Sequence, residues 1–470
     1  MRRFIGLGGL VSVAVAVTAA FLSLSAGDRV PETKHVTAKD AASLVVHEWG
    51  TFTNFSGSDG VQLEFRPLLE RDLPGFVVDY QEHFGRSLGK YELRAFQRME
   101  TPVTYFYTPV ERDVQVRVAF PQGLLTEFFP PVVELTPAPP EDAGFFGDPV
   151  ANMPLKDGSL DWGTVRLIPI DSLTTQVADR VLAKSMGRFL ERELVPAAAA
   201  HPHYVHARDT DSALVDVRFE KSHGQVGTGD YFEKFLFYRG VGNFKLPLTL
   251  AAHGEGAYEL TNKGSDAIRS LFLVTIKGDK VRFNLYDRIN ADSALTLVAG
   301  QQDVTVDGLA ESMVAALTLE GLYPKEAQAM VNSWRDSWFA EEGTRLLYMV
   351  PQRLTDELLP LEVSPRPDET VRVLVGRMEI MAPEDERRIL ELVLRSASAR
   401  AAEQQNPKAG TATDATGRGV PRAAVFNELL ALGRLAEPAL VRAQHVATDK
   451  TTRDEAAMLA TELRWRQQQQ

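Results

Sequence analysis

The fold is decided by the stretch Leu44-Val45-Val46-His47-Glu48-Trp49-Gly50-Thr51-Phe52-Thr53. Its valines, aromatic residues and threonines are typical of a buried strand. Side chains alternate between the two faces of a strand, so His47 and Glu48 point away from each other unless a bulge intervenes, for which Gly50 is suited. We therefore expect one of the two side chains to be satisfied in the core and Glu48 to pair with an embedded arginine.

Short strand patterns continue along the chain to about residue 298. Gly, Pro, Asp and Asn separate them at spacings of roughly 8–12 residues, which is typical of antiparallel sandwiches. We predict an α+β protein whose main part, residues 44–382, is an antiparallel β-sandwich-like domain with a helical insertion. Within it we expect a surface loop at 130–158, an amphipathic helix at 173–194 and a helical hairpin around 307–340.

The chain changes character at Pro383, after which its pattern predicts helices. The acidic run Glu384-Asp385-Glu386 lies where the helix dipole favours negative charge, in a first turn. A segment with Gly, Thr, Asn and Pro at 405–420 predicts a flexible linker, and three more helices are expected at 422–432, 437–445 and 452–466. Residues 383–470 are therefore expected to form an α-helical C-terminal appendage, through which a protein partner could dock.

The N-terminal residues have the pattern of an export signal. The basic pair Arg2-Arg3 precedes an uncharged apolar run at 4–24, which ends in small residues. We predict a signal peptide at 1–26 and a linker at 27–43, and hence a periplasmic or extracellular location. The alternative is an uncleaved signal that anchors the protein in the membrane, since a run of about 20 apolar residues can span a bilayer.

The composition limits the classes of function. The chain of 470 residues has a formal net charge of -12, which argues against nucleic acid as a main partner. It has no cysteine, so disulfides, thiolate metal sites and covalently attached haem are excluded. A site must therefore be built from histidine, carboxylate, arginine and aromatic side chains.

Histidines are densest at His201-Pro202-His203-Tyr204-Val205-His206, and His223 follows nearby. In an extended chain His201 and His203 point the same way, and this spacing suits two imidazole ligands on zinc, copper or iron. His206 would need a turn to join them. Two interpretations stay open: a solvated polar loop, or a divalent metal site formed by His201, His203, His206 and His223.

Charged residues are embedded in or beside apolar strands. Arg98 and Glu100 share a face of one predicted strand, and Arg377 and Glu379 share a face of another. Buried charges require partners, so these residues form either ion pairs between sheet and helices or a polar pocket that binds a sugar or a carboxylate. The candidate ligand-binding residues are Trp49, Arg98, Glu127, Tyr238, Arg239, Arg377 and Glu379.

Four motifs that contain most of these residues occur in order along the chain: HEWGTFT at 47–53, RMETPV at 98–103, FYRGVG at 237–242 and VGRME at 375–379. With them, the chain over roughly residues 44–440 resembles a family of exported bacterial proteins that has no assigned activity. The resemblance implies export and one continuous large domain, and it transfers no catalytic residue. The histidine-rich loop and the helix predicted before it depart from the family pattern.

Three functions follow from these patterns. The first is an exported cell-envelope protein that binds a glycan or another envelope ligand in a polar pocket of the β-domain. The second is a metal-dependent hydrolase or oxygenase that uses His47 with the histidines at 201–206 on a divalent metal, with Glu48 or Glu100 as the base. The third is a scaffold that docks protein partners through the C-terminal helices.

Overall fold

A computed structural model of the chain describes residues 43–66, 73–85, 93–139, 153–173, 202–220, 226–254, 256–405, 412–413, 419–420 and 422–468. These residues belong to one compact unit that spans residues 40–470. The predicted signal peptide, nearly all of the linker after it, the amphipathic helix at 173–194 beyond its first residue and most of the linker at 405–420 lie outside the described residues.

The stretch at 44–53 lies in the middle of a ten-stranded main sheet. All twelve residues of its strand, β1, are buried, because β1 has neighbours on both edges and covering layers on both faces. The strands follow in the order β15 (Lys280–Ile289), β14 (Ile268–Lys277), β17 (Gly343–Val350), β19 (Glu369–Ile380), β1 (Val45–Ser56), β4 (Gln97–Tyr107), β11 (Leu236–Gly242), β6 (Gly123–Phe129) and β3 (Val78–Asp79), and β2 (Gln62–Leu63) pairs with β1.

The main sheet is mixed, and this corrects one part of the prediction. β1 pairs with β4 antiparallel but with β19 parallel, over the full register from Val45 opposite Glu369 to Ser56 opposite Ile380. A wholly antiparallel domain is therefore wrong. The α+β class itself is confirmed, because the chain combines extensive sheets with a helical C-terminal part.

Three smaller sheets accompany the main sheet. In the second sheet, Trp162 of β8 meets Tyr238 of β11 with 6.3 Å between ring centroids, so this sheet packs on the face of the main sheet opposite to helix α6 (Pro324–Phe339). Its strands are β10 (Gly229–Glu233), β9 (Leu214–Phe219), β8 (Gly158–Ile168), β5 (Arg112–Phe120) and β18 (Leu361–Ser364), with β7 (Glu134–Thr136) on β8. The others are β12 (Leu248–Ala252), β13 (Ala257–Asn262) and β16 (Ser293–Val298), and the short pair β20 (Ala412–Thr413) and β21 (Gly419–Val420).

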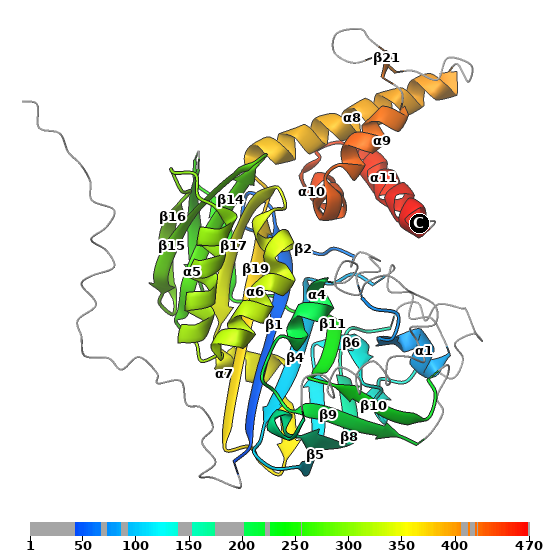
Figure 1. Cartoon of the computed structure of the whole chain (residues 1–470). Helices are drawn as coiled ribbons and strands as arrows, with labels where there is room; N and C mark the ends of the chain where they lie inside the picture. Colours follow the sequence, from blue (N-terminus) through cyan, green and yellow to red (C-terminus); the bar gives the residue numbers. More distant parts are fainter. Residues whose placement is uncertain are drawn as a thin grey trace, which may run out of the picture. The chain divides into compact units, whose positions relative to one another are not determined.

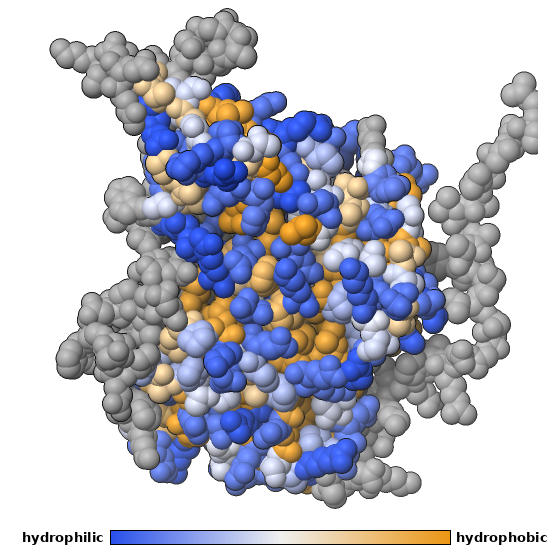
Figure 2. Space-filling model, turned by 180° about the vertical axis from the view of Figure 1, so that it is seen from behind, coloured by the Kyte–Doolittle hydropathy of each residue, from blue (hydrophilic) through white to orange (hydrophobic). Residues whose placement is uncertain are grey.

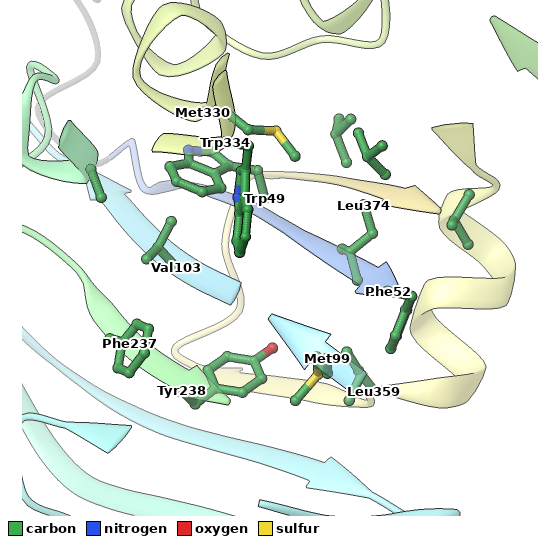
Figure 3. Packing of buried hydrophobic residues seen from close by; sticks show 14 of the residues in the cluster. Trp49, Phe52, Met99, Val103, Phe237, Tyr238, Met330, Trp334, Leu359 and Leu374 are labelled. Atoms are coloured by element: carbon green, nitrogen blue, oxygen red, sulfur yellow. The ribbon is translucent and has the colours of Figure 1, made fainter. Parts of the chain in front are cut away.

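The expected helical hairpin around 307–340 is present as α5 (Val306–Leu319) and α6 (Pro324–Phe339), which cover one face of the main sheet (Figure 1). Pro324 occupies the first turn of α6, where its missing N–H costs nothing. Figure 3 shows Trp49 of β1 beside Trp334 and Met330 of α6, whereas Met99, Tyr238 and Leu359 gather away from them. The other described helices before residue 383 are short: α1 (Tyr80–Phe84), η2 (Ile170–Ser172), α4 (Pro202–Val205), η3 (His206–Arg208) and α7 (Gln352–Leu358).

The C-terminal part is helical, as predicted, and has a hydrophobic core of its own. This core also takes in Phe55, Leu63 and Phe65 from the N-terminal end of the chain, so the helices are joined to the β-rich part through apolar contacts. None of the helices among the described residues is both long enough and apolar enough to cross a membrane. The C-terminal elements are α8 (Pro383–Gln405), α9 (Arg422–Leu430), η4 (Gly433–Leu435), α10 (Ala436–Val446) and α11 (Lys450–Gln468).

Hydrophobic and hydrophilic residues intermingle on the surface seen from behind, with hydrophobic ones most frequent in the middle (Figure 2). Within the described ranges, the most exposed large hydrophobic side chains are Leu319, Leu285 and Leu394, which belong to three different elements. Exposed leucines that are scattered singly over a surface do not mark a binding site.

Candidate functional site

His47 is buried on the face of β1 that α6 covers. Its Nδ1 atom lies 2.7 Å from a carboxylate oxygen of Glu326 in α6, and its ring centroid lies 4.4 Å from that of Tyr323. The second Glu326 oxygen accepts a 2.6 Å hydrogen bond from the hydroxyl of Tyr107. His47 therefore links the helix to the sheet.

Glu48 is buried on the opposite face and has three kinds of partner. One carboxylate oxygen lies 2.6 Å from the guanidinium of Arg372 on β19. The other accepts hydrogen bonds from the hydroxyls of Tyr238 at 2.6 Å and Thr104 at 3.0 Å. The expected pairing of Glu48 with an embedded arginine is thus confirmed. We call Glu48, Thr104, Tyr238 and Arg372 the Glu48 lock.

A bulge interrupts the pairing of β1 and β4 at Gly50. The extra residue lies on β4, where Thr101 has a φ of 52°. A Cβ atom on Gly50 would come within 2.9 Å of the Cα of Pro102, so a side chain there would force the two strands apart. Because the bulge follows Glu48 and adds no residue to β1, His47 and Glu48 remain on opposite faces, as predicted.

A second group of buried charges lies further along β1, on the same face as His47. Thr53 of β1 stands opposite Arg98 of β4 on one side and opposite Arg377 of β19 on the other. Each arginine pairs with the acid two residues on: Arg98 with Glu100 at 3.1 Å and Arg377 with Glu379 at 2.5 Å. The predicted sharing of faces is confirmed for both pairs, and the register brings the two pairs together.

Further charges converge on these pairs from other elements. Arg345 of β17 lies 3.0 Å from Glu379. Glu341, which follows α6, lies 2.8 Å from Arg377 and 3.1 Å from Arg434 of the C-terminal part. Arg239 of β11 is close enough to Glu100 to influence its titration. We call this group the arginine cluster: Arg98, Glu100, Arg239, Glu341, Arg345, Arg377, Glu379 and Arg434.

The arginine cluster has five arginines and three glutamates as members, and its electrostatics reflect that excess. Burial alone would raise the pKa of Glu100, but Arg98, Arg434, Arg377 and Arg239 outweigh it and lower this pKa to about 2. Burial lowers the pKa of Arg434, and the neighbouring guanidinium of Arg377 lowers it further. In the described part of the chain, the buried Nη1 of Arg377 has no hydrogen-bond partner.

A small cavity lies beside the arginine cluster. Its volume is about 10 Å³, and its lining includes Thr53, Arg98, Glu100 and Arg434. A space of this size holds one water molecule at most. Any larger ligand therefore requires side chains at its wall to move.

A larger hollow of about 210 Å³ adjoins this cavity, and Phe65, Arg66 and Glu437 line both. Glu437 of α10 lies 3.7 Å from Arg66 and 3.4 Å from Arg464 of α11. Burial raises the pKa of Glu437 to about 7, against the opposing effects of Arg66 and Arg94. We call this hollow, between the segment around Phe65 and helices α10 and α11, the outer groove.

Another hollow, of about 790 Å³, is lined mainly by residues of the second sheet. Its charged residues include Asp113, Arg166, Asp216 and Arg218. Arg166 and Arg218 are more than half exposed, so water screens their charges. The arginine cluster is the stronger candidate because its charges are buried and come from separate motifs.

The predicted metal ligands are not brought together in the described residues. Residues Pro202–Val205 form helix α4 instead of the extended chain we expected, and the Nδ1 of His203 lies 2.6 Å from the carbonyl oxygen of Ser333. His206 lies 3.6 Å from Asp209 in the following turn. Neither these two nor any other His, Asp or Glu residues of the described ranges form a group of three that could hold a metal. His201 and His223 lie outside those ranges.

The remaining predicted residues divide between the two buried groups and the core. Arg98, Glu100, Arg239, Arg377 and Glu379 belong to the arginine cluster, and Glu48 and Tyr238 to the Glu48 lock. Trp49 packs under α6 in the hydrophobic core. Glu127 pairs with Arg239 in the strand register and accepts a hydrogen bond from Thr126.

Several residues of these groups were not predicted from the sequence: Glu326, Glu341, Arg345, Arg372, Arg434 and Glu437. Arg345 and Arg372 could have been predicted as buried charges, because each lies at the edge of an apolar strand pattern. Glu326 lies in the first turn of a helix, where an acidic residue is ordinarily expected to cap the helix or to stabilise its dipole. Nothing in the local sequence marks Arg434 as a neighbour of Arg377.

Comparisons with known proteins add little at this point. The sequence matches no family model, and no curated protein matches it. Among solved structures, the zebrafish Fcho1 mu-homology domain with a bound Eps15 peptide aligns with 8% identity over 73% of this chain and 99% of its own, with a TM-score of 0.26. The yeast delta-COP-I mu-homology domain with a Dsl1 peptide aligns with 7% identity over 72% and 96%, with a TM-score of 0.23.

Proposed function

We propose that this chain is an exported cell-envelope protein that binds the anionic group of an envelope ligand, such as a glycan bearing carboxylate or phosphate, at the arginine cluster. The observation that carries this proposal is the convergence of charged residues from three separate motifs. Guanidinium groups form two parallel hydrogen bonds to carboxylate or phosphate, which makes arginine the preferred residue for such recognition. Export and the family resemblance remain part of the proposal and rest on the sequence.

A hydrogen-bond donor in the cluster supports binding of an anion. The Nη1 atom of Arg377 lacks a hydrogen-bond partner among the described residues and offers a donor for that anion. A charge-assisted hydrogen bond from a buried guanidinium to an anion is stronger than a bond between neutral groups.

The anion would enter from the side of Arg434. Arg434 is 14% exposed, whereas Arg377 and Arg345 are at most 1% exposed. Arg434 also lines the small cavity and belongs to the C-terminal part, so it can move without disturbing the strands. It is therefore the residue whose replacement should affect binding most and folding least.

The proposal is tested by titrating the purified protein with inorganic phosphate in a calorimeter. Arg434→Gln removes a charge-assisted hydrogen bond worth about 1.5–3 kcal/mol, so we expect the affinity to fall by about 10–100-fold. The matched control is Arg442→Gln. Arg442 also ties α10 to the rest of the protein, through Asp59 at 3.1 Å and Glu386 at 2.6 Å, but it is not a member of the arginine cluster.

We expect Arg442→Gln to bind phosphate as the wild type does. Equal losses in the two variants would mean that both act through the docking of the C-terminal helices, and the proposal would fail. Absence of phosphate binding by the wild type, in buffer of low ionic strength, would also overturn it. Thermal unfolding of each variant shows whether it is folded during the titration.

At the level of the fold, we propose that the main and second sheets are the two layers of a β-sandwich-like core. The contact of Trp162 with Tyr238 supports this. Phe120 of β5 also lies 6.0 Å, between ring centroids, from Phe244, which follows β11. Replacing Trp162 with Ala should expose the lock residue Tyr238 and destabilise the protein by about 3–5 kcal/mol. Urea unfolding followed by circular dichroism measures this loss.

A further inference from the structure

The outer groove has the lining expected of a site for a small polar ring. Arg66, Arg94 and Arg464 surround it with donors, and Gln444 adds an amide. Phe65 and Val441 supply an apolar patch between these polar side chains. Ligand sites generally combine apolar walls with a few placed polar groups. At about 210 Å³ the hollow is smaller than usual sites for drug-sized ligands, which start near ~300 Å³, so its occupant must be small.

The outer groove lies next to the small cavity of the arginine cluster. Both are lined by Phe65, Arg66 and Glu437, so these three residues form the wall between them. Glu437 is held there by Arg66 and Arg464, one on each side. An elongated ligand that reaches the arginine cluster from the outer groove must pass this wall. The part of the ligand that does not reach the cluster then lies in the outer groove.

We infer that the outer groove holds the sugar ring of a monosaccharide whose anionic group reaches the arginine cluster. This inference rests on the proposed function, and it narrows the ligand from an anion in general to an anionic sugar unit. The hydroxyl groups of the ring would bond to Gln444 and to the arginines of the groove, and one face of the ring would lie on Phe65. A bare anion would use the inner part of the site alone.

Glu437 lies between the two parts, in contact with Arg66 and Arg464. Burial raises its pKa to about 7. Near neutral pH its side chain therefore repels an approaching anion less than a fully ionised carboxylate would.

The test compares four probes on the full chain by calorimetry: inorganic phosphate, glucose 6-phosphate, glucuronate and glucose. Glucose 6-phosphate and glucuronate separate a phosphate from a carboxylate as the anionic group. Ala457→Trp places a large ring over the groove from an exposed position on α11. The matched control is Ala401→Trp, at an exposed position on α8 away from the groove.

We expect at least one of the anionic sugars to bind about tenfold or more tightly than inorganic phosphate, and glucose not to bind. Ala457→Trp should abolish this advantage and leave phosphate affinity unchanged, whereas Ala401→Trp should match the wild type. If phosphate binds but neither anionic sugar binds more tightly, or if Ala457→Trp keeps the advantage, this inference is wrong and the proposed function stands. If no anion binds the wild type, both are wrong.

Discussion

The Glu48 lock and the arginine cluster both draw residues from strands β4, β11 and β19, yet they differ in their balance of charge. On β19, Arg372 of the lock and Arg377 of the cluster lie on opposite faces of the main sheet. In the lock, Arg372 and the hydroxyls of Tyr238 and Thr104 share one carboxylate, Glu48, and Arg372 has a second acid in Asp356 at 2.9 Å. In the cluster, arginines outnumber glutamates and a cavity lies alongside.

This difference shows that the burial of charged residues does not by itself identify a binding site. Both the lock and the cluster contain buried charged residues. The carboxylate of the lock has partners on β4, β11 and β19, and Arg372 also lines a hollow of about 190 Å³. The cluster borders on the outer groove, and one of its arginines comes from the C-terminal part, which makes it the group that can respond to a ligand.

The largest expected effect is in the lock. Glu48→Ala leaves Arg372 buried with only the half-exposed Asp356 as a partner. Removal of one partner from a buried pair costs about 3–5 kcal/mol, and we expect that loss in the free energy of unfolding, measured with urea. Phosphate affinity of the folded fraction should not change. A loss below about 1 kcal/mol would mean that the lock contributes little.

His47→Gln should give the next largest effect. It weakens a buried hydrogen bond to Glu326, and an unsatisfied buried carboxylate costs about 1–3 kcal/mol. We expect that destabilisation, with no change in phosphate binding or in the metal content found by elemental analysis. The control is His253→Gln, at an exposed position, which should be neutral. A loss of bound metal in His47→Gln alone would restore the metal-dependent alternative.

The pH dependence of stability should distinguish the wall residue Glu437 from the cluster residue Glu100. The pKa of Glu437 is raised to about 7, so the folded chain keeps this proton while the unfolded chain loses it near pH 4.5. Stability therefore falls as the pH rises from about 4.5 to 7. Glu437→Gln should remove this fall, which is on the order of 1–3 kcal/mol.

Glu100 should act in the opposite direction. Its pKa is lowered to about 2, so its contribution is complete above the unfolded value of 4.5 and disappears as the pH falls from 4.5 toward 2. Urea unfolding between pH 3 and pH 8 measures both effects. Parallel pH profiles for the wild type and Glu437→Gln would contradict the assignment of Glu437 as a group that titrates near neutral pH.

The smallest expected effect on stability is that of Glu341→Gln. The direction of its effect on phosphate affinity distinguishes a binding site from a purely structural group of ion pairs. Glu341 pairs with Arg377 and Arg434 but is 37% exposed. Glu341→Gln removes one negative charge from the cluster at a cost in stability of less than about 1 kcal/mol. We expect phosphate to bind several-fold more tightly, as calorimetry would show. Weaker binding would mean that Glu341 orients the arginines for the ligand, and an excess of positive charge would not explain the site.

Local sequence patterns predicted those features that depend only on alternation along a strand. The separation of His47 from Glu48 and the shared faces of Arg98 with Glu100 and of Arg377 with Glu379 required no knowledge of the fold. Helical periodicity and the position of Pro324 likewise predicted the hairpin of α5 and α6. The proline at 202 could have been read in the same way, as the first residue of a helix.

Long-range register decided what the sequence could not. Arg372 lies 324 residues from Glu48 and becomes its neighbour only because β1 pairs with β19 in parallel. Arg434 meets the cluster only because the C-terminal helices share a hydrophobic core with Phe55 and Phe65. No local pattern encodes these contacts, so the sequence predicted Arg98, Glu100, Arg239, Arg377 and Glu379 but neither the other members of the cluster nor their assembly.

The most direct test of the central claim is a crystal structure of the protein with bound selenate, whose anomalous scattering marks an anion by element. We expect an anomalous peak within hydrogen-bond distance of the guanidinium groups of Arg377 and Arg434, at about 2.7–3.1 Å. We expect no peak at the Glu48 lock. Selenate found only at exposed arginines such as Arg166, with the cluster unchanged, would contradict anion binding at the arginine cluster.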